Sequence, residues 1–125
     1  MTPEEQAVVM VYASIKDRVP YAQDVFIAAV KDWDVTPLVE QGEVIGGVIA
    51  KGNELHVGYG RKPRASIKSH IKKTLNELIT KYGCAITLIN ADNKAGVKFC
   101  ERLGFVKLSE KDGKIWLKCN RSNYL

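Results

Sequence analysis

The sequence predicts an α+β fold, an α/β sandwich in which a mixed, mostly antiparallel sheet is flanked by helices. Three observations predict it. The first 31 residues carry apolar side chains at helical spacing, and 35–60 then changes to short β-rich stretches separated by Gly-containing links. At 61–89 a basic loop, an amphipathic helix and a continuous apolar run follow, which is the pattern of a helix leading into a buried strand.

The length and composition indicate one globular domain over 1–125. Of the 125 residues, 46% are hydrophobic and 26% are charged, which is enough apolar material for a core. No apolar run approaches the roughly 20 residues of a membrane-spanning helix, and Glu4 and Glu5 are unlike the start of a signal peptide. The three cysteines form no CxxC pair, so we expect no metal site, no disulfide framework and a cytoplasmic location.

Two helices are expected before the first strand. Thr2 can cap the first, Pro3 suits its first position, and Glu5 completes a capping box. Pro20 interrupts the helical pattern because proline cannot continue a helix interior. A second helix is therefore predicted over about 21–31.

Three strands in an antiparallel meander follow. Short Gly-containing links join them as hairpin turns, and the strands are expected at Val35–Gln41, Val44–Ala50 and Glu54–Gly60. Pro37 cannot donate a hydrogen bond to a neighbouring strand, so the first strand belongs at a sheet edge, where it could pair with a second chain in a homodimer. Gly46 and Gly47 predict a bulge in the second strand or a close approach by another element.

The remaining chain predicts two further helices, a buried strand and a final hairpin. A helix over about 66–82 precedes the apolar run Cys84–Ile89, which is typical of a strand buried on both faces. Asn93 can cap a helix that continues to Leu103 and stops at the following glycine. The strands of the hairpin are expected at Phe105–Leu108 and Lys114–Cys119.

Positive charge is concentrated in one stretch. The net charge is +5, and the sequence between 61 and 81 has a single acid, Glu77, and seven basic residues: Arg61, Lys62, Arg64, Lys68, Lys72, Lys73 and Lys81. Such a cluster indicates nucleic acid, anionic lipid or a phosphorylated ligand as partner, or else a solvated helix face. The basic residues have no aromatic side chains among them to stack on bases, which disfavours nucleic acid. Arg61, Lys62 and Arg64 lie where a loop opens a helix, and the first backbone N–H groups of a helix can hold phosphate.

A motif near the C-terminus resembles a known family. The stretch from Asn93 to Phe105 is similar to the pattern N-x-x-A-x-x-F-Y-E-K-L-G-F of the GNAT family of acyl-CoA-dependent N-acetyltransferases. The matching positions are Asn93, Phe99, Glu101, Leu103, Gly104 and Phe105. The resemblance covers roughly 33–118, and the chain is similar to the small divergent forms that bacteriophages encode.

The resemblance implies that the chain uses acetyl-CoA as a cosubstrate. In GNAT proteins the strand before the basic loop splays from the next strand, so the sheet has a V-shaped split, and the pyrophosphate lies in the loop. Here the two strands would be Glu54–Gly60 and Cys84–Ile89. The residues implied to contact acetyl-CoA are Val57, Gly58, Tyr59, Arg61, Lys62, Arg64, Ala65, Ser66, Asn93 and Phe99.

The chain departs from the family pattern at the loop and at the acid position. The loop, usually Q/R-x-x-G-x-G/A, has Arg64 and Ser66 in place of its glycines, and Pro63 has no N–H to donate. Arg64 would crowd the phosphate or replace the lost contact with a charge-assisted one. Cys100 stands where the family has the tyrosine that protonates the leaving thiolate, so it is either an acid or a small buried residue.

A base that takes the proton of the attacking amine is expected on the strand before the loop. Strand alternation places Glu54 and His56 on one face, and histidine is the side chain that titrates near neutral pH. Alternatively, a histidine in a strand is a hydrogen-bonded structural group. Together with Cys100, these two residues form the predicted catalytic set.

Three functions follow from these observations. The first is an N-acetyltransferase that moves the acetyl group of acetyl-CoA to a primary amine by direct attack in a ternary complex, without a metal. The second keeps the fold but not the chemistry, as an inactive binding or structural protein of a phage, in the host cytoplasm or the virion. The third is a nucleic-acid-binding module that uses the basic face at 61–81. The sequence names no acceptor amine.

Overall fold

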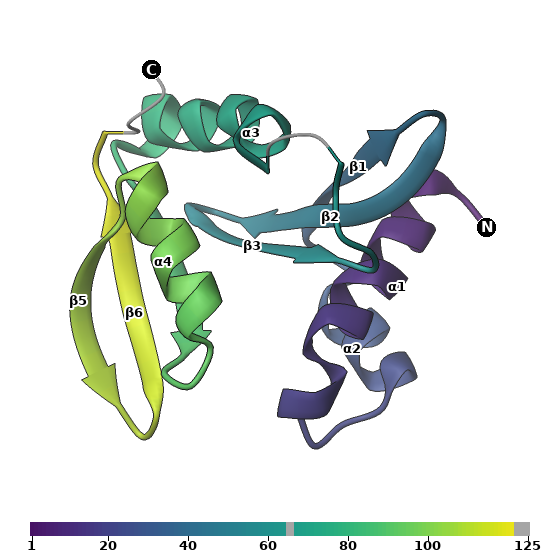
Figure 1. Cartoon of the computed structure of the whole chain (residues 1–125), viewed down its shortest axis with the longest axis horizontal. Coiled ribbons are helices and arrows are strands. Elements are labelled where there is room, and N and C mark those ends of the chain that lie inside the picture. The colour runs from purple at the N-terminus through teal and green to yellow at the C-terminus, as the bar shows by residue number, and fades with distance from the viewer. Residues whose placement is uncertain (65–66, 122–125) are drawn as a thin grey trace. The chain divides into compact units, whose positions relative to one another are not determined.

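The computed structural model of the chain describes residues 1–64 and 67–121. Its elements follow one another in the predicted order, with one short 3-10 helix added after the first helix (Figure 1). They are α1 (Pro3–Ile15), η1 (Lys16–Arg18), α2 (Gln23–Ala29), β1 (Asp34–Glu40), β2 (Glu43–Lys51), β3 (Glu54–Tyr59), α3 (Ile67–Tyr82), β4 (Ala85–Asn90), α4 (Lys94–Leu103), β5 (Val106–Lys111) and β6 (Lys114–Cys119).

The sheet has six strands in the order β1-β2-β3-β4-β6-β5. The pairs β1–β2, β4–β6 and β5–β6 are antiparallel, whereas β3 and β4 are parallel. The parallel pair is registered at Glu54↔Ile86, beside a backbone hydrogen bond of 2.8 Å from Ile86 N to Asn53 O. This pairing joins the first residue of β3 to β4. The predicted mixed, mostly antiparallel sheet is confirmed.

The chain divides into two compact units. Unit 1 consists of Met1–Lys51 and His56–Ile67, and unit 2 consists of Gly52–Leu55 and Lys68–Leu125. The expectation of one domain over 1–125 stays a prediction.

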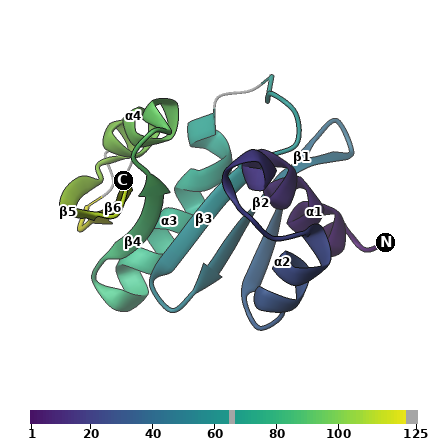
Figure 2. The ribbon, with the colours of Figure 1, turned by 90° about the horizontal axis from the view of Figure 1, so that it is seen from below.

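In unit 1, α1 and α2 pack against the hairpin β1–β2 (Figure 2). Helix α1 starts with the predicted capping box, in which the Thr2 hydroxyl accepts from Glu5 N and the Glu5 carboxylate accepts from Thr2 N, both at 3.1 Å. Apolar residues from α1 and from α2 with its C-terminal cap pack against β2 in one buried cluster, formed by Val8, Val11, Phe26, Val30 and Ile49. Apolar burial of this kind provides most of the stability of a short helix.

Glycines let α1 approach the sheet closely. A Cβ atom on Gly47 would lie 2.9 Å from the Ala7 Cβ, and one on Gly58 would lie 2.9 Å from the Val11 Cα. Both distances are too short for a real side chain, so these two positions require glycine. The β1–β2 register also shifts between Leu38 and Val39. The predicted close approach and bulge near Gly46 and Gly47 are both confirmed.

Both ends of α2 differ from the expectation by two residues, whereas the strand ends in unit 1 differ by at most one residue. Helix α2 is shorter than predicted at both ends, because Ala22 is extended and the chain turns after Val30, whose carbonyl accepts from Trp33 N at 3.0 Å. Strand β1 does lie at the edge of the sheet, as Pro37 predicted.

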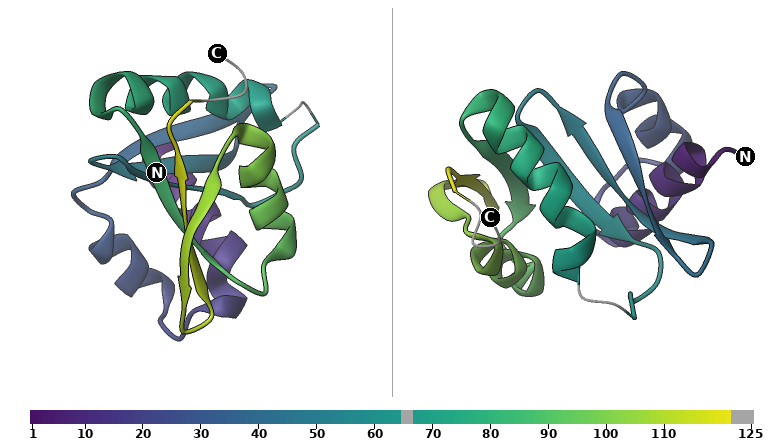
Figure 3. Two further views of the ribbon diagram at one scale, coloured as in Figure 1. Left: turned by 90° about the vertical axis from the view of Figure 1, so that its left-hand side faces the viewer. Right: turned by 90° about the horizontal axis from the view of Figure 1, so that it is seen from above.

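In unit 2, the hairpin β5–β6 continues the sheet from β4 (Figure 3). Helix α4 begins at the predicted cap, where the Asn93 side chain accepts from Gly96 N at 3.1 Å, and it ends at Gly104 with φ of 112°. Only glycine adopts such a φ readily, which explains why the helix stops there. The core of this unit includes Leu75, Leu103, Phe105, Leu117 and Cys119.

The expectation that β4 is buried on both faces is wrong. Ala85 and Thr87 are buried, but Ile86 and Leu88 on the opposite face are only half-buried. A continuous apolar run therefore does not by itself show that both faces of a strand are covered. Across 1–64 and 67–121, the helices are too short or too polar to span a bilayer.

Candidate functional site

The basic loop that follows β3 is described as far as Arg64, so two of its predicted ligand contacts, Ala65 and Ser66, lie outside the described residues. At the start of the loop, Gly60 N donates to the Ile45 carbonyl at 2.8 Å. Lys62 and Arg64 are exposed. Pro63 lies between them and has no N–H.

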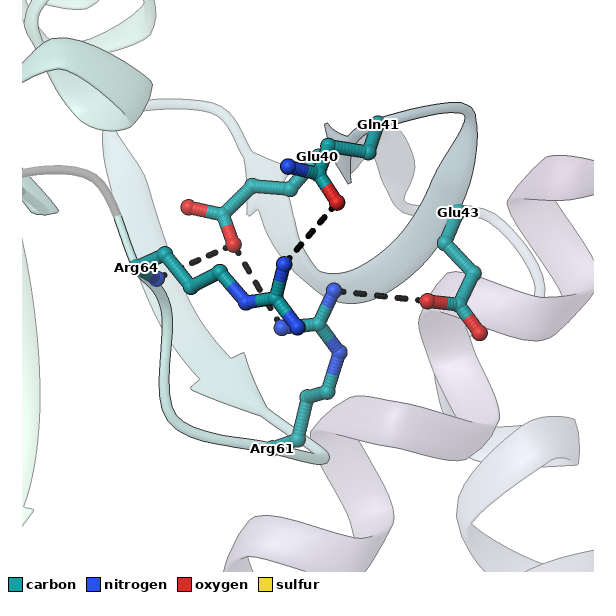
Figure 4. Close-up of polar contacts among 5 residues, drawn as sticks. All are labelled: Glu40, Gln41, Glu43, Arg61 and Arg64. Atoms are coloured by element: carbon teal, nitrogen blue, oxygen red, sulfur yellow. Dashed lines mark hydrogen bonds and ion pairs between the residues drawn. The ribbon is translucent and has the colours of Figure 1, made fainter.

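A buried carboxylate from a neighbouring strand contacts this loop. Glu40, the last residue of β1, is only 8% exposed. Its Oε1 accepts a hydrogen bond of 3.0 Å from the backbone N–H of Arg64 and lies 3.4 Å from Nη1 of Arg61 (Figure 4). A buried carboxylate needs such partners because it has lost its hydration. The loop thus binds an anion that belongs to the chain itself.

The β1–β2 turn supplies two more contacts to the same loop. Nη2 of Arg61 lies 3.4 Å from Oε2 of Glu43, and Nη1 of Arg64 donates to Oε1 of Gln41 at 2.9 Å (Figure 4). Gln41 and Gly42 both have positive φ, 52° and 77°, as in the two-residue turns that join antiparallel strands. The turn and the loop are therefore held together by polar contacts on both arginines.

Glu40 was assigned no role from the sequence, although one signal for it was present. In a strand, alternate residues share a face, so Glu40 lies in phase with Leu38, which is 3% exposed. A carboxylate in phase with a core leucine predicts a buried charge, and a buried charge requires a cation or a hydrogen-bond donor.

Tyr59, at the end of β3, is half-buried near this cluster. Burial, and to a smaller extent the negative charge of Glu40, together raise the pKa of its phenol to about 12. The Tyr59 hydroxyl therefore stays protonated at neutral pH and can donate a hydrogen bond.

His56 lies earlier on β3 and packs beside an indole ring. The centroids of the His56 and Trp33 rings are 5.7 Å apart, and the ring planes are tilted by 43°. Trp33 itself packs on the apolar cluster between α1 and α2. Strand alternation places His56 on the same face as Gly58, which contacts α1, while the half-buried Val57 lies on the opposite face. His56 is thus held by unit 1, whereas Glu54 belongs to unit 2.

In unit 2, the motif residues lie on α4. Asn93 caps the helix, and Phe99 is half-buried. Cys100 is 7% exposed, and burial raises the pKa of its thiol to about 12, with further contributions from Cys119 and Glu101. A thiol with so high a pKa is a weak acid at neutral pH. The geometry favours the interpretation of Cys100 as a small buried residue.

The structure brings together part of the predicted site. Arg61 and Arg64 meet at Glu40, and Tyr59 lies within its electrostatic reach. Seven predicted residues belong to unit 1, namely His56, Val57, Gly58, Tyr59, Arg61, Lys62 and Arg64. Four belong to unit 2, namely Glu54, Asn93, Phe99 and Cys100. Among the residues that the structure describes, no group of three or more His, Cys, Asp or Glu side chains could hold a metal ion.

No protein-family model and no curated protein sequence matches the chain. Solved structures do match it. The ribosomal-protein-alanine N-acetyltransferase of Brucella melitensis is 14% identical with a TM-score of 0.69, and the match covers 94% of this chain and 95% of that one. The ribosomal-protein-S18-alanine N-acetyltransferase of Escherichia coli is 16% identical with a TM-score of 0.65, over 93% and 88% of the two chains.

A third structure was solved with a ligand. The PaiA N-acetyltransferase of Thermoplasma acidophilum, in complex with coenzyme A, is 12% identical with a TM-score of 0.65, and the match covers 97% of this chain and 96% of that one. These matches span more than nine-tenths of the chain. The chain therefore has the fold of the GNAT N-acetyltransferases, as the Asn93–Phe105 motif predicted.

Proposed function

We propose that the protein is an N-acetyltransferase that moves the acetyl group of acetyl-CoA to a primary amine. The observation that carries this proposal is the shared fold: acetyltransferases match more than nine-tenths of the chain. The capped helix α4, with its motif, lends further support, and the Thermoplasma acidophilum structure contains coenzyme A. Because a fold hosts many activities, the chemistry must come from particular residues.

The reaction we propose is direct attack in a ternary complex. The amine nitrogen attacks the thioester carbonyl carbon, a C–N bond forms, the C–S bond breaks, and the thiolate leaves. His56 or Glu54 takes the proton that the amine must lose. The Trp33 ring packs beside His56, with the two ring centroids 5.7 Å apart. Cys100 is not needed, since a thiolate is a good leaving group and the buried Cys100 thiol has a pKa of about 12.

The diphosphate of acetyl-CoA would be held by the basic loop. Arg61, Lys62 and Arg64 provide the positive charge, and Lys62 is exposed. The backbone provides fewer donors than a glycine-rich loop, because Pro63 has none and Gly60 N already donates to a carbonyl. The backbone N–H of Arg64 is bonded to Glu40. The charge of the loop therefore fits a diphosphate, but both guanidinium groups and the Arg64 N–H already contact groups of the chain itself.

A second function is favoured by that last observation. If Glu40 holds the loop permanently, the protein keeps the fold but binds no acyl-CoA, and it acts as a binding or structural component. The two functions differ in one measurable property, which is affinity for coenzyme A.

Thermal unfolding in the presence of acetyl-CoA, free coenzyme A or a single-stranded oligonucleotide tests these alternatives. A ligand at 100 times its Kd stabilises the folded state by about 2.7 kcal/mol, which shifts the melting temperature by several degrees for a chain of this size. Stabilisation by both coenzyme A forms but not by the oligonucleotide is the expected result. No shift with millimolar acetyl-CoA would exclude the enzyme, and a shift with the oligonucleotide alone would favour a nucleic-acid module.

Catalysis is then measured as thiol release from acetyl-CoA in the presence of amines. A peptide with an N-terminal alanine is the first acceptor to test, because the Brucella melitensis and Escherichia coli proteins are named for that chemistry. Polyamines and lysine peptides complete the panel. Binding without release for any amine would leave the binding-protein function.

A further inference from the structure

The contacts of Glu40 are those that a bound phosphate would make. Phosphate sites in proteins combine a backbone N–H with a guanidinium group. Glu40 Oε1 accepts from the Arg64 N–H at 3.0 Å and lies 3.4 Å from Nη1 of Arg61. One carboxylate oxygen of the chain thus bonds both kinds of donor in the basic loop.

We propose that the Glu40 carboxylate is an internal competitor for the anion site of the loop, and that an acyl-CoA diphosphate must displace it to bind. Glu40 is then a residue that sets the affinity and specificity of the loop for anions. This inference rests on the proposed function, because it assigns the loop to the diphosphate of acetyl-CoA.

The geometry is that of a contact that can be exchanged. The separation of 3.4 Å between Glu40 and Arg61 exceeds the roughly 2.7–2.9 Å of a strong charge-assisted hydrogen bond. Arg61 is also divided between two carboxylates, because its Nη2 lies 3.4 Å from Glu43. A diphosphate brings more negative charge and more acceptor oxygens to the same donors, and a displaced Glu40 regains its hydration in water.

Glu40 could either compete with the ligand or support the loop, and the two alternatives predict opposite changes in anion affinity when Glu40 is replaced. If Glu40 competes with the ligand, then removing its charge frees the Arg64 N–H and Arg61 and removes a repulsion, so anions bind more tightly. If Glu40 instead holds the loop in the shape that the ligand needs, then removing it weakens binding. The sign of the change decides between them.

Glu43 provides a matched control. Glu43 carries the same charge as Glu40 and contacts the same arginine, but its side chain is 75% exposed. In the described part of the chain, the Arg64 N–H donates to Glu40 and not to Glu43. Glu43→Gln and Glu40→Gln change the net charge equally. A general electrostatic effect would make the two variants alike, whereas competition at the loop affects Glu40→Gln alone.

The experiment is a calorimetric titration of the wild-type protein, Glu40→Gln, Glu40→Ala and Glu43→Gln with coenzyme A and, separately, with inorganic pyrophosphate. We expect both Glu40 variants to bind both anions at least about tenfold more tightly than wild type, the scale of one hydrogen bond to a charged group. Glu43→Gln should change affinity by less than about twofold, as exposed ion pairs do. Circular dichroism and thermal unfolding verify that each variant is folded.

A measurement on the wild-type protein does not depend on the folding of any variant. Titration with pyrophosphate, followed by NMR, should shift the backbone amide of Arg64 and the side-chain carboxyl carbon of Glu40 together. Shifts that spare both groups at saturation would overturn the proposal.

The outcomes separate this inference from the proposed function. Unchanged or weaker coenzyme A binding by both Glu40 variants, with wild-type binding intact, overturns the competition and leaves the acetyltransferase standing. Tighter pyrophosphate binding without any coenzyme A binding supports the competition and refutes the acetyltransferase. If no variant binds either anion, the loop is not an anion site and the inference is wrong.

Discussion

The basic loop at 61–64 and the helix α4 both carry residues that the sequence marked for ligand binding, but their contacts are of different kinds. On α4, Asn93 bonds Gly96, three residues away, and the helix ends in a glycine turn. In the loop, Arg61 and Arg64 bond Glu40, which is 21 and 24 residues away. The contact on α4 is local, whereas the contacts of the loop depend on the β1–β2 hairpin, whose Glu40 lies more than 20 residues earlier in the sequence.

This difference shows which positions can be interpreted from motifs alone. The motif on α4 predicts a helix with a given start and stop, and that helix is present. The positive charge of the loop predicts an anion, but the anion that it contacts is a carboxylate of the same chain. A charge motif therefore indicates the chemistry of a partner without telling whether that partner is internal or external.

The largest expected effect is on turnover, and it differs between β3, which leads into the loop, and α4. His56→Ala should lower turnover by roughly 10²-fold or more, because it removes the proposed general base that precedes the loop. Cys100→Ala on α4 should lower turnover by less than about tenfold, because the buried thiol transfers no proton in the proposed reaction. Steady-state thiol release measures both. The reverse order of effects would place the proton chemistry on α4 instead.

The next effect concerns stability at the loop. Arg61→Ala should lower the free energy of unfolding by about 1–2 kcal/mol, because the buried Glu40 loses a charged partner while keeping the Arg64 N–H. Urea unfolding measures it. Glu43→Gln, at an exposed position, should change stability by less than about 0.5 kcal/mol. Equal effects of the two substitutions would show that Glu40 does not depend on Arg61.

A smaller effect tests the local cap of α4. Asn93→Ala should destabilise the protein by about 1 kcal/mol, because the Gly96 N–H loses its acceptor. Asn93→Ser should restore most of this loss, since serine also caps helices, and Lys94→Ala at the exposed next position serves as the control. Thermal or urea unfolding measures these stabilities. If Asn93→Ser were no more stable than Asn93→Ala, the result would contradict a local cap.

The smallest effect is a titration beside the loop. Burial and then the Glu40 charge raise the pKa of Tyr59 to about 12, so an absorbance titration should show Tyr59 ionising well above the usual tyrosine value of about 10. Since the fold favours the neutral phenol, its contribution to stability is complete below the unfolded pKa of about 10 and is lost as the pH rises through 12.

Variants assign this titration step. Tyr59→Phe should remove the step near pH 12. Glu40→Gln should lower the pKa of Tyr59 while leaving it raised, because burial is the larger cause, and Glu43→Gln serves as the matched control. A step that does not move in Glu40→Gln would show that the carboxylate and the phenol are not coupled.

The sequence by itself determined the features that depend on neighbours within a few residues. The capping box at Thr2 and Glu5, the cap at Asn93 and the stop at Gly104 all rest on contacts that span three to five residues. The order of helices and strands and the edge position of β1 followed from periodicity and from Pro37. Such features are readable because the side chain and its partner lie on the same short segment.

Only the tertiary structure decided what the site residues touch. The pairing of Arg61 and Arg64 with Glu40, and the contact of His56 with Trp33, join segments that are more than 20 residues apart. The half-buried face of β4 likewise depends on what covers the strand, which its apolar run does not specify. Charge and hydropathy state what kind of partner a side chain requires, and the folded chain then selects that partner because folding alone sets the distances on which hydrogen bonds and ion pairs depend.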